Sequence, residues 1–86
     1  MPRLLNKDII SFVNYALRAK KGYASTITFN KRFYVSIFKV KKTLYVCLFD
    51  REKNGFIRKR KFLIDQVDRK MSSIIKLVKN YKKLVS

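Results

Sequence analysis

A run of four cations supplies the clearest chemistry in this chain. Residues 58–61 read Arg-Lys-Arg-Lys between apolar residues at 56–57 and 62–64. Guanidinium and ammonium groups at this density bind the phosphates of a polyanion. Aromatic and β-branched residues fill the preceding stretches 33–40 and 43–49. Aromatic rings beside cations can stack on bases, or belong to a sheet that enters a DNA groove. The sequence therefore predicts a nucleic-acid-binding surface around residues 33–64.

The net charge points to the same class of ligand. The 86 residues hold 22 Lys+Arg against 5 Asp+Glu, which gives a net charge of +17. Like charges at this density repel one another in the compact state, and a polyanion relieves that repulsion while counterions are released. We expect DNA ahead of RNA as the ligand, with an acidic protein or an anionic membrane surface as the electrostatic alternatives.

Catalysis is not expected. The chain has no histidine, so the usual general base is missing. Two glycines cannot form a phosphate-cradling loop, and the single cysteine, Cys47, cannot form a disulfide within the chain. The acidic residues have structural places at expected helix starts or in a polar loop: Asp8, Asp65, Asp68, Asp50 and Glu52. We therefore predict no enzyme, no metal site and no cofactor.

The elements that position these residues follow from the hydrophobic periodicity. Apolar residues at helical spacing predict a helix from an Asn6 cap to about Lys20, with Gly22 ending it, and a second helix after an Asp65 cap. Alternating patterns predict strands at 24–29, 33–40, 43–49 and 56–64. We predict one α+β domain over residues 1–86. It is an antiparallel meander of three to four strands between N- and C-terminal helices (α-β-β-β-β-α), with both helices on one face.

The pairing of the two central strands divides the sheet into two faces. A two-residue turn at Lys41-Lys42 sets Phe38 opposite Tyr45 and Tyr34 opposite Phe49. The other face of these strands is aliphatic, so it suits the helices. The aromatic face is then the open one. The alternative is that these aromatic residues form the core beneath a helix packed on that side.

The register of the last strand decides which cations join the aromatic face. Pairing of Phe49 with Phe56 places Arg58 and Arg60 beside the central aromatic face, and Lys59 and Lys61 toward the helices. A slip of one residue exchanges the two pairs, and the sequence leaves both registers open. The candidate nucleic-acid-binding residues are Lys31, Arg32, Tyr34, Phe38, Lys39, Lys41, Lys42, Tyr45, Arg51, Lys53, Arg58, Lys59, Arg60 and Lys61.

The order of elements resembles the double-stranded RNA-binding domain in topology. That family places a basic cluster at the start of its second helix, where this chain has Asp65 and Asp68 before Arg69 and Lys70. Docking on duplex RNA in that mode is therefore not expected. A basic sheet laid in the DNA major groove, as in integrase-arm and plant AP2-type domains, is a better analogy.

Several further readings stay open from sequence. The chain could be a small basic inhibitor or adaptor that docks on an acidic protein, or an RNA-binding, ribosome-associated protein. The apolar line of the second helix could form a homodimer seam instead of packing on the sheet. No apolar run is long enough for a membrane span and no signal peptide opens the chain. We therefore expect a cytoplasmic, nucleoid or nuclear protein.

Overall fold

The computed structural model describes residues 4–20 and 23–86, and its elements follow the predicted order. Their bounds are α1 (Asn6–Arg18), β1 (Ala24–Thr28), β2 (Phe33–Val40), β3 (Thr43–Asp50), β4 (Gly55–Leu63), a short 3₁₀ turn η1 (Ile64–Gln66) and α2 (Val67–Val85). The strands form one open antiparallel sheet in the order β1-β2-β3-β4. The predicted α+β fold is confirmed, with four strands. The prediction that Gly22 ends the first helix lies outside the described residues.

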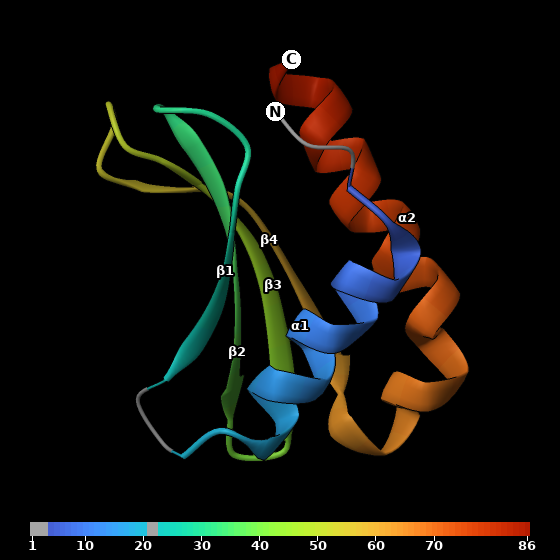
Figure 1. Ribbon diagram of the computed structural model, residues 1–86. Helices are drawn as coiled ribbons and strands as arrows, with labels where there is room; N and C mark the ends of the chain where they lie inside the picture. Colours follow the sequence, from blue (N-terminus) through green and yellow to red (C-terminus); the bar gives the residue numbers. More distant parts are fainter. Residues whose placement is uncertain (1–3, 21–22) are drawn as a thin grey trace.

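Both helices pack on the same face of the sheet (Figure 1). Ile9 and Val13 of α1 are fully buried, as are Ile74 and Val78 of α2. They meet an aliphatic floor contributed by the central strands, which consists of Val35, Ile37, Leu44, Val46 and Leu48. The helix-free face is left open. The alternative that placed the aromatic residues beneath a helix is therefore wrong.

The ends of the helices differ from the sequence prediction. Asn6 is the first residue of α1, and the backbone N–H of Leu5 before it donates to the Asp8 carboxylate at 3.3 Å. Asp65 does not cap α2, because it lies in η1 and α2 begins at Val67 with no side-chain cap. An acidic residue near a helix start marks that start to within a few residues, because its charge complements the helix dipole anywhere in the first turn.

The β2–β3 hairpin has the predicted register. Val40 pairs with Thr43 around a two-residue turn, and Tyr34 pairs with Phe49 further along. Lys41 in this turn has a φ of 56°, a conformation that glycine or asparagine adopts at lower cost. The turn therefore forms without the residues that usually favour it, because the long pairing of two hydrophobic strands fixes its geometry.

The apolar line of α2 is occupied within the chain. Val67, Ile74 and Val78 are at most 1% exposed, and Tyr81 donates from its hydroxyl to the carbonyl oxygen of Val46 at 3.3 Å. Burial raises the pKa of the Tyr81 phenol, so the group stays a donor at neutral pH. The residues on which a homodimer seam would depend are thus already packed against the sheet.

Candidate nucleic-acid interface

A cluster of five aromatic rings lies on the helix-free side of the sheet. Its members, which define the aromatic face, are Tyr34, Phe38, Tyr45, Phe49 and Phe56. Tyr34 stacks on its cross-strand partner Phe49 at 4.7 Å between ring centroids, and Phe38 stacks on Tyr45 at 5.2 Å. Phe56 of β4 links the two pairs, since it meets Phe49 edge-on at 5.3 Å and Phe38 at 6.2 Å. Cross-strand pairing of aromatic residues therefore builds one continuous apolar surface over three strands.

Three cations border this surface. The Arg51 guanidinium carbon lies 4.8 Å from the Tyr34 ring centroid. The ammonium nitrogens of Lys59 and Lys61 lie 5.5 and 5.8 Å from the Tyr45 ring centroid. Such cation–π contacts hold the charges beside the rings while leaving them accessible to solvent. The aromatic face is thus a nonpolar surface with positive charge along two of its sides.

A β-bulge selects the cations that reach the aromatic face. Phe49 pairs with Phe56, as in one of the two registers left open, but the register shifts directly after this pair. Lys59 then pairs with Cys47 and Lys61 with Tyr45, so the lysines join the aromatic side. Of the two registers that the sequence left open, the one that places Lys59 and Lys61 on the aromatic side holds beyond the bulge, and Arg58 and Arg60 lie on the other side.

The bulge follows from the position of Ile57. This residue packs against the core, and its neighbour Arg58 pairs with the buried Leu48, so two consecutive residues lie on the helix side. Burial of the Ile57 side chain favours this break in the alternation. Arg58 and Arg60 remain exposed because β4 is an edge strand. The Arg60 guanidinium carbon lies 5.4 Å from the ring centroid of Phe62.

The ring contacts limit what the aromatic face can do. Tyr34 has Phe49 and Arg51 as neighbours, and Tyr45 has Phe38 and two lysines. A base can stack on a ring only where a ring face is free, so these tyrosines are poorly placed as stacking platforms. Phe56 is the most accessible ring of the cluster, at 49% exposed. The aromatic face therefore has few free ring faces, and the cations beside it are exposed.

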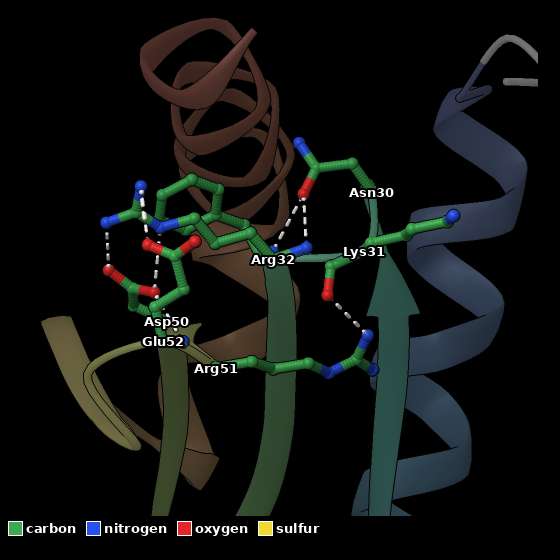
Figure 2. A network of polar contacts seen from close by, with 7 residues as sticks. Asn30, Lys31, Arg32, Asp50, Arg51 and Glu52 are labelled. Atoms are coloured by element: carbon green, nitrogen blue, oxygen red, sulfur yellow. Dashed lines mark hydrogen bonds and ion pairs between the residues drawn. The ribbon is translucent and has the colours of Figure 1, made fainter.

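Arg32 has a structural role that the sequence did not reveal. Its guanidinium forms two hydrogen bonds of 3.0 Å to the buried Asp50 carboxylate and an ion pair of 3.0 Å with Glu52 (Figure 2). The same end of the sheet is closed by Arg51, which donates to the carbonyl oxygen of Lys31 at 3.2 Å. Arg32 therefore joins the 30–32 turn to the end of β3 and the 51–54 loop. Its positive charge is paired with Asp50 and Glu52 of the same chain.

Lys39 is also held within the fold. It pairs with Leu44 on the helix side of the sheet, and its ammonium donates to the carbonyl oxygen of Leu17 at 2.8 Å. A cation at the C-terminal end of a helix satisfies a free carbonyl and complements the helix dipole. Lys39 thus lies away from the aromatic face.

The remaining candidate cations are in turns. Lys31 and Lys53 are exposed at the end of the sheet where Arg51 lies, and Lys41 and Lys42 are exposed at the opposite end. The β3–β4 hairpin that carries Lys53 leans away from the helices (Figure 1). Charges at both ends could therefore extend a contact made by the aromatic face.

Phe49 and Phe56 are members of the cluster that were missing from the predicted site residues. Their signal was the expected pairing of the two, since a cross-strand partner of an exposed aromatic residue shares its face. Cys47 and Ser36 lie on the same side but are buried among the rings. Burial raises the pKa of the Cys47 thiol, so this residue packs as a small neutral side chain.

Comparison with known protein families, curated proteins and solved structures gives no match. Among residues 4–20 and 23–86, no group of three or more His, Cys, Asp or Glu side chains is arranged to hold a metal ion. No helix in the described part of the chain has both the length and the apolar character needed to cross a membrane.

Proposed function

We propose that this protein binds nucleic acid without enzymatic activity, with duplex DNA as its preferred ligand. The observation that carries the proposal is the aromatic face, a ring cluster bordered by Arg51, Lys59 and Lys61 on the side of the sheet that no helix covers. In a chain of net charge +17, such a surface offers phosphate contacts beside a nonpolar area.

Phosphate contacts would supply most of the binding free energy. Lys59 and Lys61 project from an edge strand, so they can reach a phosphate backbone without clashing with the rest of the sheet. The rings beside them would contact sugars and base edges in a groove, since Tyr34, Phe38, Tyr45 and Phe49 each have a stacked partner on one face. Duplex DNA is favoured over a single strand because this geometry offers few stacking positions.

Competition among nucleic acids tests this proposal. Fluorescence anisotropy at fixed salt would compare a labelled 20-base-pair DNA duplex with single-stranded DNA and duplex RNA of the same length. We expect the DNA duplex to bind most tightly. Equal affinity for all three nucleic acids would contradict the preference for duplex DNA and indicate nonspecific electrostatic binding. Tighter binding of the single strand would also overturn that preference.

A pair of matched variants locates the surface. K59Q/K61Q should weaken duplex binding about tenfold and lower the slope of log K against log salt by about two, since each lysine is expected to neutralise one phosphate. K7Q/K20Q removes the same charge from exposed positions on and beside α1 and should change the affinity much less. Equal losses in the two variants would show that net charge, and not the aromatic face, determines binding.

A second candidate is an adaptor or inhibitor that docks on an acidic protein. The observation in its favour is apolar exposure among the cations, because Phe56 is 49% exposed and Leu63 is 54% exposed. Protein interfaces combine such apolar anchors with a charged rim. Capture experiments with and without nuclease separate the two candidates, since a protein partner is retained after nuclease digestion and a nucleic-acid-mediated one is lost.

A further inference from the structure

A second basic surface runs along the outer side of α2. Val67, Ile74 and Val78 direct one line of the helix toward the sheet. Arg69, Lys76 and Lys83 are exposed and repeat at intervals of seven residues. At 3.6 residues per turn they lie on the line opposite the buried one, with successive members about 10.5 Å apart along the axis. Because the buried line of α2 faces the sheet, this row of cations points away from it.

Lys79 adds to this row and completes what we name the helix stripe: Arg69, Lys76, Lys79 and Lys83. Lys79 lies three residues after Lys76 and four before Lys83, so like charges are neighbours on the helix surface. An ordinary solvated helix relieves such repulsion with glutamates, but α2 contains no glutamate and its acidic residue is Asp68 in the first turn.

The rest of the described chain supplies no carboxylate that forms an ion pair with the helix stripe. Among residues 4–20 and 23–86, the ion pairs all involve Arg32, which binds Asp50 and Glu52.

Lys79 and Lys83 also line a shallow hollow of about 380 Å³ together with Leu4, Lys82 and Ser86. A polyanion bound along this side would relieve the repulsion between the like charges of the helix.

The two basic surfaces face opposite directions. Figure 1 shows both helices on one face of the sheet. The aromatic face is on the opposite face, and the helix stripe is on the side of α2 that faces away from the sheet. The Cα trace measures 32 × 25 × 17 Å, whereas the persistence length of duplex DNA is about 500 Å. A duplex bound to one surface therefore cannot readily bend around the protein to reach the other.

We propose that one chain bridges two duplex segments, with the aromatic face on one duplex and the helix stripe on the second. This inference rests on the proposed function, because it assigns a second binding surface for the same class of ligand. The chain would then act as a linker between DNA segments, or between distant parts of one molecule.

A two-duplex capture assay tests the bridge. A biotinylated duplex on streptavidin beads is mixed with the full chain and a second, fluorescent duplex, and the fluorescence retained on the beads is measured. Wild type should retain the second duplex. K76Q/K79Q/K83Q should reduce the retained fluorescence at least about tenfold, since three phosphate contacts are removed, while its affinity for a single duplex in anisotropy stays within about threefold. K7Q/R18Q/K20Q removes equal charge around α1 and should bridge like wild type.

The outcomes separate the two proposals. A wild-type chain that binds no duplex in anisotropy defeats the proposed function, and bridging with it. A chain that binds one duplex but retains no second duplex defeats bridging only. Unchanged retention by K76Q/K79Q/K83Q also overturns the inference, because the bridge would then come from self-association through other surfaces.

Discussion

The Asp50 carboxylate is the most deeply buried charge in the described structure, at 1% exposed. It accepts two hydrogen bonds from the Arg32 guanidinium and one from the backbone N–H of Glu52, each at 3.0 Å. A buried carboxylate without such partners would be strongly destabilising, so the stability of this end of the sheet depends on the pair. The sequence predicts that Arg32 contacts the ligand, but its pairing with Asp50 gives it a structural role instead.

Neutralising Asp50 should destabilise the protein. D50N removes the charge that faces Arg32 and replaces one acceptor oxygen with an amide NH2, which cannot accept the second Arg32 hydrogen bond. We expect the Tm to fall by roughly 5–10 °C at neutral pH. E52Q is the matched control, because Glu52 is exposed and makes one ion pair with the same arginine. Its Tm should stay within about 2 °C of wild type. Similar shifts for both variants in thermal unfolding would contradict the special role of the buried carboxylate.

The effect of D50N should depend on pH. Hydrogen bonds from Arg32 hold the pKa of the Asp50 carboxyl below its ordinary range. The stability contributed by this depressed pKa is complete above the unfolded value of about 3.9 and is lost as pH falls through the folded value. Wild type and D50N should therefore differ most near pH 7 and converge as pH falls below about 3.9 and through the folded value. Tm measurements across this range check the prediction, and a gap that widens in acid would refute it.

At the scale of elements, Lys39 connects α1 to the sheet. Its ammonium donates to the Leu17 carbonyl near the end of α1. K39M keeps most of the apolar stem but loses this bond, and we expect the free energy of unfolding to fall by about 1 kcal/mol. K42M, in the exposed β2–β3 turn, should change it by less than about 0.5 kcal/mol. Urea unfolding measures both variants. Weaker DNA binding by K39M without any loss of stability would place Lys39 in the interface instead.

The faces of the central hairpin could be predicted from sequence because long alternating strands leave little freedom. Slipping Tyr34 or Phe38 by one residue would bury polar groups and expose the aliphatic floor, so the β2–β3 register follows from the pattern. The β4 register could not be predicted in the same way. Its middle is cationic, so no hydrophobic alternation fixes it, and the packing of Ile57 against the core decides it instead.

The roles of individual cations were also beyond the sequence. Lys39 and Lys59 are both strand lysines, and only the positions of α1 and the bulge show that one is held in the fold and the other lies beside Tyr45. Likewise, the partnership of Arg32 with Asp50 needs the 30–32 turn and the end of β3 to meet in space. Composition predicts that a basic protein binds an anion, but tertiary contacts determine which cations remain available.

At the scale of the whole molecule, the positions of the unpaired cations matter as much as their number. The ion pairs of the described residues involve Arg32, which belongs to neither basic surface. The cations of the two surfaces have no carboxylate within 4.0 Å among these residues. Positive charge therefore remains on both sides of a small domain. This arrangement opposes folding and favours association with a polyanion at the same time.

Salt should consequently have opposite effects on stability and on binding. Raising NaCl from about 50 to 500 mM screens the self-repulsion and should increase the Tm of the free protein by a few degrees. The same change should weaken duplex binding, with a slope of log K against log salt of about −2.7 to −4.5 if three to five phosphates are neutralised at about 0.9 each. Thermal unfolding and anisotropy in matched buffers measure the two trends. A duplex affinity that does not change across this range would exclude phosphate contacts as the main source of binding free energy. A Tm that falls with added salt would show that attraction between the charges of the free protein outweighs their repulsion.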